Sequence, residues 1–388
     1  MNIRAEQQLR PFHIAVHDDV LRDLRERLTK AKWPYTPATS DWRYGTDRSF
    51  LGQTVDYWLK TYDWRACEAK WNRYPQYIVN IDGYDIHFIY VRGSGSNPLP
   101  LILTHGWPGS FVEFESVIEP LAHPEQFGGS PDDAFDVVVP SIPGYGWSSP
   151  PQQPITTRDV APLWNKLMVD VLGYPSYVAQ GGDWGSLIAS WLGVDFPQTA
   201  KAIHINIMGL RPFTGEGSAP FSDDEKVWLA KARDRLRRES GYQAIQGTKP
   251  QTLAFGLSDS PLGLAAWIME KFHGWSDSPD NVLPFTPDQL ITNVMIYWVT
   301  NSIHTSTWLY TAARLKGGMG LAAGEHVTVP TGFLSCPHDL FPPPPDDWVR
   351  RTYHLVHRTN LTAGGHFIAY ERGEELVKDM RKFFANYR

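Results

Sequence analysis

A glycine-flanked aspartate is the side chain whose surroundings best suit chemistry. Residues 181–185 read Gly-Gly-Asp-Trp-Gly, after a predicted strand at 176–179 and before a predicted helix at 187–196. A nucleophile on such a sharp strand-to-helix turn needs small neighbours, because the turn is tight and pushes the central side chain outward. Asp183 is therefore a candidate nucleophile. An ordinary glycine-rich turn, in which the aspartate caps the helix, would show the same pattern.

A second motif could stabilise negative charge beside this aspartate. His-Gly-Trp-Pro-Gly at 105–109 follows the apolar strand expected at 99–104. A loop in this place can aim a backbone N–H at a developing oxyanion, together with the N–H that follows the nucleophile. The pattern assigns these two donors to the main chain of Trp107 and Trp184.

A histidine and a second acid complete the candidate set. Gly-Gly-His-Phe at 364–367 places His366 near the C-terminus, which fits the chain order nucleophile, acid, histidine. The acid must then lie between Asp183 and His366. Asp339 is the preferred residue, because it sits where the loop leaves a predicted strand. Asp346 and Asp347 are alternatives, but they precede a predicted helix and suit capping better.

These residues are carried by alternating strands and helices. The change from helical spacing to alternating apolar residues begins near residue 77. Predicted strands lie at 77–81, 86–91, 99–104, 135–139, 176–179, 202–208 and 328–334, with an amphipathic helix at 158–172 between two of them. Short apolar strands separated by helices indicate a doubly wound α/β sheet.

The alternation is interrupted once, which suggests an insertion. Helical stretches at 223–239, 261–271 and 289–315 occur with no convincing strand between them. The predicted organisation is a Trp- and Tyr-rich N-terminal meander, a first part of the α/β core, a helical lid and a second part of the core, at residues 1–75, 76–210, 211–325 and 326–388 respectively.

Composition excludes several other classes of protein. The 388 residues include 36 Lys and Arg against 42 Asp and Glu, so the net charge of −6 argues against a nucleic-acid partner. Two cysteines cannot form a disulfide framework or a zinc site. No apolar run approaches the roughly 20 residues of a membrane span, and residues 1–10 are polar. The expectation is a soluble, cytoplasmic protein without a membrane anchor.

The motifs together resemble the microsomal type of epoxide hydrolase, within the α/β-hydrolases. The likeness covers nearly the whole chain: the loop at 105–111, the aspartate turn at 181–185, the histidine motif at 364–367, and Pro11-Phe12 with Trp33-Pro34 near the N-terminus. It implies an α/β-hydrolase fold with a mostly parallel eight-stranded sheet, an inserted helical lid and an N-terminal meander. Mammalian members begin with a membrane anchor, which is not expected here.

The resemblance also implies a reaction and two further residues. It assigns Tyr242 and Tyr310 of the lid as acids, and it implies hydrolysis of an epoxide to a vicinal diol through an ester on Asp183. Aspartate is ionised at pH 7 and attacks without a base, whereas tyrosine keeps its proton and can donate it to the alkoxide. His366, oriented by Asp339, would then activate water. This chemistry requires no metal or organic cofactor.

Two other functions fit part of the pattern. Haloalkane dehalogenases share an aspartate followed by a tryptophan, although the lid tyrosines and Trp107 favour the epoxide reaction. A non-catalytic binding module would be expected to lack part of the catalytic set, which is complete here. The expected partners are water and an apolar aromatic or aliphatic epoxide, bound by Trp107, Trp184 and Phe213, in a detoxifying role. The aromatic N-terminal segment could also join two copies in a homodimer.

Overall fold

A single mixed sheet forms the centre of the molecule. The computed structural model describes residues 9–38 and 41–388, so most of the polar N-terminal stretch considered above lies outside it. The sheet has nine strands in the spatial order β1-β2-β3-β5-β4-β6-β7-β8-β9. In chain order they span Arg10–Phe12, Gln76–Ile81, Tyr84–Val91, Leu99–Thr104, Phe135–Pro140, Tyr177–Gly181, Ala200–Ile205, Val327–Ser335 and Tyr353–Asn360.

The pairing of the strands confirms the predicted mostly parallel sheet. From β5 to β9 every neighbouring pair is parallel, whereas β1, β2, β3 and β5 pair antiparallel. Eight strands were expected and nine are present. The additional strand is β1, which pairs with β2 and belongs to the N-terminal segment. Three residues are too short for an alternating pattern to show in the sequence.

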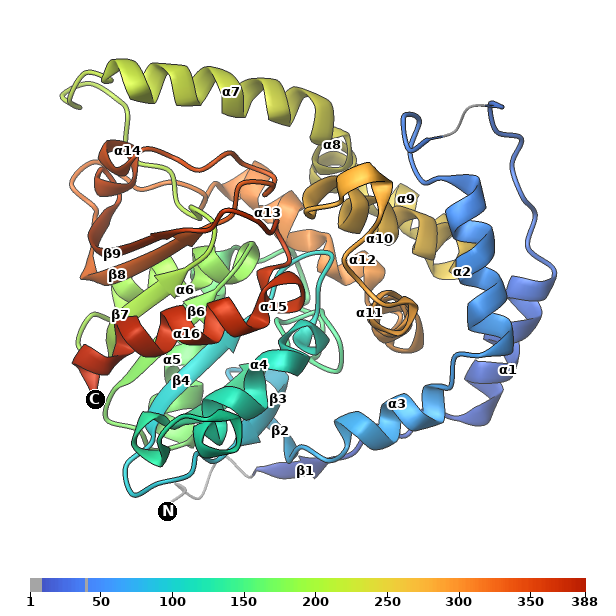
Figure 1. Ribbon diagram of the computed structural model, residues 1–388, viewed down its shortest axis with the longest axis horizontal. Coiled ribbons are helices and arrows are strands. Elements are labelled where there is room, and N and C mark those ends of the chain that lie inside the picture. The colour runs from blue at the N-terminus through green and yellow to red at the C-terminus, as the bar shows by residue number, and fades with distance from the viewer. Residues whose placement is uncertain (1–8, 39–40) are drawn as a thin grey trace.

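Helices cover both faces of the sheet (Figure 1). On one face lie α4 (Glu115–Ala122), α15 (Ile368–Glu371) and α16 (Gly373–Phe384), which contact one another. On the other face α5 (Thr157–Lys166) packs against α6 (Trp184–Asp195). Because both faces are covered, the central strands are buried and read as continuous apolar runs.

Seven α-helices are inserted between β7 and β8, and we call them the inserted helices. They are α7 (Asp223–Glu239), α8 (Gly241–Thr248), α9 (Pro250–Asp259), α10 (Pro261–Trp275), α11 (Pro287–Thr300), α12 (Ile303–Ser306) and α13 (Trp308–Lys316); α14 (Asp346–Arg350) follows β8. The single helix predicted at 289–315 is wrong, because Asn301 adopts φ 50° and ends α11.

None of the helices in the described part of the chain is both long and apolar enough to cross a bilayer.

The N-terminal segment runs along the outside of the inserted helices. It contributes α1 (Asp18–Thr29), α2 (Arg48–Lys60) and α3 (Trp64–Trp71), and α1 and α2 contact α10 while α2 also contacts α11 (Figure 1). Polar contacts join the two parts, as in the hydrogen bond of 2.6 Å from Thr46 Oγ1 to Ala266 O. This packing holds the inserted helices from the side opposite the sheet.

The first turn of α6 lies against the end of β4 without room for a side chain. A Cβ added to Gly185 would lie 1.9 Å from the carbonyl oxygen of Thr104, and one added to Gly181 would lie 2.1 Å from the carbonyl oxygen of Gly185. Backbone atoms cannot turn aside as a flexible side chain can. Glycine at 185 therefore sets how closely the corner between β6 and α6 approaches β4.

We expect Gly185→Ala to lower the free energy of unfolding by about 3 kcal/mol or more, because the new methyl group collides with backbone. Gly256→Ala is the matched control, since Gly256 is also helical but no atom lies within 4 Å of an added Cβ. That control should be neutral or stabilising by about 0.5–1 kcal/mol. Urea unfolding measures both values, and equal midpoints for the two variants would contradict this steric account.

Candidate active site

Asp183 occupies the strained corner between β6 and α6. Its backbone has φ 49° and ψ −125°, a region that residues with a side chain seldom adopt and that costs on the order of 1–3 kcal/mol. A Cβ on Gly182 would lie 2.8 Å from Asn206 Oδ1, so this position is crowded too. The corner predicted from the glycine pattern is present, and it presents the carboxylate of Asp183 beyond the carboxyl end of the sheet.

The loop after β4 contacts this carboxylate through its backbone. The N–H of Trp107 donates a hydrogen bond of 2.8 Å to Asp183 Oδ1. Trp184 is the first residue of α6, and the N–H groups in the first turn of a helix have no partner within that helix. Of the two predicted backbone donors, Trp107 thus already contacts the carboxylate, and Trp184 lies at the positive end of a helix dipole.

His366 connects Asp183 to Asp339. Its Nε2 is 3.5 Å from Asp183 Oδ2, and its Nδ1 is 2.7 Å from Asp339 Oδ1. Asp339 also accepts a hydrogen bond of 2.5 Å from the backbone N–H of Leu340. The alternative acid Asp346 lies instead at α14, where its carboxylate is 3.9 Å from Arg350. The structure therefore brings together Asp183, His366 and Asp339.

Contacts from distant parts of the chain hold the histidine loop. The backbone N–H of His366 donates to the carbonyl of Trp275, at the end of α10, over 2.7 Å. Glu371 accepts the backbone N–H of Asp277, and the Asp277 carboxylate accepts that of Gly364, both over 2.9 Å. None of these supports was predicted, because nothing in the local sequence signals a contact across 87 to 94 residues.

Two carboxylates set the charge of the histidine. Burial opposes protonation of His366, but the charges of Asp339 and Asp183 outweigh it and raise the pKa of the imidazole well above its usual value. The two carboxylates therefore favour the cationic form of the imidazole. A change that neutralised Asp183 would remove one of these two charges and move the pKa of His366 downward.

The two candidate tyrosines form an aromatic wall above Asp183. Tyr242 on α8 stacks on the Trp107 indole with centroids 5.2 Å apart, and Tyr310 on α13 meets the Trp184 indole edge-on at 4.6 Å. The tyrosine rings lie 5.6 Å from each other. Burial and then the charge of Asp183 raise the pKa of Tyr242, and burial likewise raises that of Tyr310. Both phenols therefore keep their protons.

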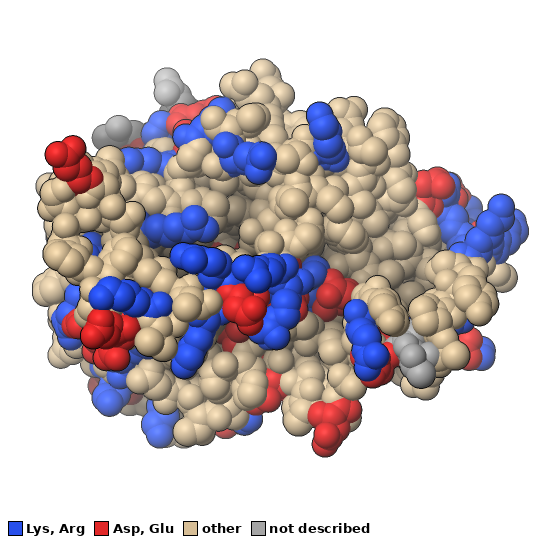
Figure 2. All heavy atoms as spheres, turned by 90° about the horizontal axis from the view of Figure 1, so that it is seen from above, with Lys and Arg blue, Asp and Glu red and all other residues tan. Residues whose placement is uncertain are grey.

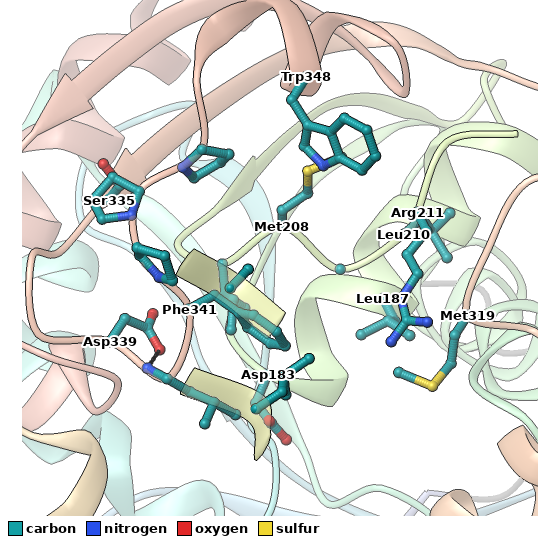
Figure 3. A pocket seen from close by; sticks show the side chains of 18 of the residues that line it. Asp183, Leu187, Met208, Leu210, Arg211, Met319, Ser335, Asp339, Phe341 and Trp348 are labelled. Atoms are coloured by element: carbon teal, nitrogen blue, oxygen red, sulfur yellow. Dashed lines mark hydrogen bonds between the residues drawn. The ribbon is translucent and has the colours of Figure 1, made fainter. Parts of the chain in front are cut away.

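A cavity of about 410 Å³ leads to Asp183. Figure 3 shows Asp183 at one end, with Leu187, Met208, Phe341 and Trp348 around the space. The volume lies within the range usual for small-molecule sites, about 300–1,000 Å³. Most of these walls are apolar, so the cavity suits a ligand with little charge near the carboxylate.

The outer part of the cavity lies beneath α7. Trp228, Leu229, Ala232 and Leu236 of this helix line it. Viewed from the side on which α7 lies, Lys and Arg side chains gather across the face of the molecule (Figure 2). Those of α7 are Lys226, Lys231, Arg233, Arg235, Arg237 and Arg238. The same helix also carries five acidic residues, Asp223, Asp224, Glu225, Asp234 and Glu239, so six basic against five acidic side chains leave it a net charge of only +1.

The structure does not place Phe213 at this cavity. Pro212 and Thr214 line it, whereas Phe213 is 38% exposed and its ring lies over Gly215. The ring packs on the backbone two residues further along instead of entering the cavity, a contact that the local sequence does not signal. Trp184 lines the large cavity, whereas Trp107 lines a smaller one behind Asp183.

Two family models match the chain. The one described as alpha/beta hydrolase fold matches residues 100–219, and the one described as epoxide hydrolase N terminus matches residues 9–114. Together with the parallel sheet and the aspartate corner, these matches define an enzyme of the α/β-hydrolase fold.

Comparison with similar proteins identifies the family within this fold. Epoxide hydrolase 1 of Sus scrofa is 37% identical over 97% of this chain and 89% of its own length. The Aspergillus niger epoxide hydrolase structure superimposes with a TM-score of 0.84 at 32% identity, covering 98% of this chain and 96% of that one. Juvenile hormone epoxide hydrolase from Bombyx mori gives a TM-score of 0.86 at 31% identity, covering 99% and 95%. The chain belongs to the epoxide hydrolases, as its motifs predicted.

We expect Asp339→Asn to lower the pKa of His366, because the substitution removes the largest charge that raises it. In the unchanged protein the imidazole should stay protonated well above pH 6.5, about the usual value of histidine. NMR titration of the imidazole measures the shift. Asp346→Asn is the control, since that carboxylate is half-exposed at α14 and does not contact His366. If the imidazole of His366 titrates at the same pH in both variants, Asp339 is not the carboxylate that raises its pKa.

Proposed function

We propose that this epoxide hydrolase opens apolar epoxides through a covalent ester on Asp183. The observation that carries the proposal is the arrangement of Asp183, whose Oδ1 accepts the Trp107 N–H while its Oδ2 faces His366. Two neutral tyrosines close the same space from above. The relatives favour this reaction over dehalogenation or simple binding.

In the first step Asp183 Oδ2 attacks a ring carbon and the carbon–oxygen bond of the epoxide breaks. The oxygen that leaves as an alkoxide takes a proton from Tyr242 or Tyr310. Their raised pKa values keep these protons in place until negative charge develops on the substrate. The inserted helices act in this proposal as the lid that carries both acids.

In the second step water cleaves the ester. The ester has lost the negative charge of Asp183, so the pKa of His366 falls. The imidazolium then gives up its proton, which restores the tyrosine that protonated the alkoxide, and the neutral imidazole is available as a base. It takes a proton from water, and the oxygen of the water bonds to Asp183 Cγ. The oxyanion that forms at Oδ1 is stabilised by the Trp107 N–H, a contact that typically contributes on the order of 10²–10³ in rate. The products are a vicinal diol and free Asp183.

The origin of the diol oxygen tests the covalent route. In one turnover with excess enzyme in ¹⁸O-water, the new oxygen of the diol should come from Asp183, and the label should stay in the enzyme. Mass spectrometry of the diol and of the peptide that contains Asp183 measures this. Label in the diol after the first turnover would show direct attack by water.

Phenylalanine at the two tyrosine positions tests the acids. Tyr242→Phe and Tyr310→Phe should each slow ester formation by about 10–10²-fold, and the double variant should lose 10³-fold or more, because ring opening then lacks a proton donor. Stopped-flow tryptophan fluorescence with styrene oxide reports this step. Tyr177→Phe is the control, since that buried hydroxyl contacts Asn165 and not the cavity. An unchanged rate in the double variant would remove both tyrosines from the mechanism.

A further inference from the structure

A second cavity lies behind Asp183, away from the tyrosines. Its volume is about 20 Å³, enough for one water molecule, which needs roughly 10–15 Å³ on the same measure. The polar side chains on its wall are Asp183, His366, Glu113, Gln180 and Asn206. A site that holds one water needs two to four polar partners, and these side chains supply them.

Glu113 is the group in this cavity that the mechanism has not used. It lies in a short 3₁₀ helix at Phe111–Phe114, between the buried side chains of Val112 and Phe114. A Cβ on Gly109 would lie 2.4 Å from Glu113 Oε2, so the carboxyl group reaches back over the loop that holds Trp107. Within the described residues no hydrogen bond or ion pair occupies this carboxyl group.

Burial, more than the charges nearby, favours the neutral form of Glu113. Burial raises the pKa of Glu113 to about 8; His366 opposes this rise and Asp183 adds to it. Two ionised carboxylates already face a single imidazolium, so a third would be uncompensated. A neutral carboxyl group still accepts a hydrogen bond through its carbonyl oxygen.

A second acceptor on the wall is also without a partner. The amide of Gln180 donates to Asn206 Oδ1 over 3.0 Å, but Gln180 Oε1 is buried and unpaired. Buried polar atoms are normally hydrogen-bonded, and an unpaired one commonly marks an ordered water. Gln180 thus independently indicates that the cavity is hydrated.

We propose that this cavity holds the water that cleaves the ester and that Glu113 positions it, an inference that rests on the proposed function. The water donates one hydrogen to His366 Nε2 and the other to the Glu113 carbonyl oxygen. A lone pair then points at Asp183 Cγ. As the water oxygen bonds to Cγ, its proton passes to His366, which returns it to the diol oxygen when the ester bond breaks.

The two chemical steps separate this role from a structural one. With styrene oxide, Glu113→Leu should form the ester at the unchanged rate but hydrolyse it about 100-fold more slowly, because a misplaced reactant costs a factor of this order. Intact-protein mass spectrometry should show the ester accumulating. Glu113→Gln keeps a carbonyl acceptor, so its hydrolysis rate should stay within about tenfold. Glu374→Leu, an exposed glutamate on α16, is the control.

Several results would overturn the inference. Unchanged hydrolysis in Glu113→Leu, or equal slowing of both steps, would remove Glu113 from the positioning of water. If Gln180→Met slows ester hydrolysis and the Glu113 variants do not, Gln180 rather than Glu113 accepts the hydrogen bond from the water. If Glu113→Leu does not fold, Glu113→Ala takes its place with the same expected rates. If the unsubstituted protein also forms no ester, the covalent mechanism itself is overturned. This outcome differs from one in which the ester forms but Glu113 plays no part in its hydrolysis.

Discussion

The positive φ angle of Asp183 is maintained by the contact of α6 with β4. The corner can form only because the first turn of α6 approaches the carbonyl of Thr104 without an intervening side chain. Strain of this size persists only where the surrounding packing determines the backbone. The same contact brings the loop after β4 close enough for the Trp107 N–H to reach the carboxylate. The geometry around Asp183 therefore depends on one close packing of backbone on backbone.

The second constraint is the balance of buried charge. Asp183 and Asp339 are stabilised by one imidazolium, and each carboxylate also accepts a backbone N–H. This balance changes when Asp183 loses its charge in an ester, because one of the two charges that stabilise the protonated form of His366 is then removed. The arrangement thus couples the chemical state of the nucleophile to the protonation of the base. Glu113 fits the same balance only as a neutral acid.

The third constraint is the position of the inserted helices. Tyr242 and Tyr310 come from two of them, and Trp275 and Asp277 at the end of α10 hold the histidine loop. The N-terminal segment packs on the outside of α10 and α11. The helix that holds the histidine loop is thus itself supported by a segment far away in the chain, which is one physical use for the length beyond an ordinary α/β domain.

Local features of the chain were readable from the sequence because they rest on local sterics. Glycines around Asp183 are required by a tight turn, and apolar runs mark strands covered on both sides, so the corner, the loop before it and the fold class could all be predicted. His366 and Asp339 could be predicted because they follow Asp183 in the order acid, histidine, and because Asp339 comes directly after a predicted strand. Tyr242 and Tyr310 came only from family resemblance, since a tyrosine in a helix has no distinctive local pattern.

Only the tertiary structure decided the contacts between distant segments. It turned Phe213 away from the cavity, ended a predicted helix at Asn301, and added β1 to the sheet. It also brought Glu113 behind Asp183, although nothing in the sequence distinguishes this residue from Glu115 two positions later. Such results depend on which surfaces meet across tens to hundreds of residues, and this is determined by packing of the whole chain rather than by the residues beside each position.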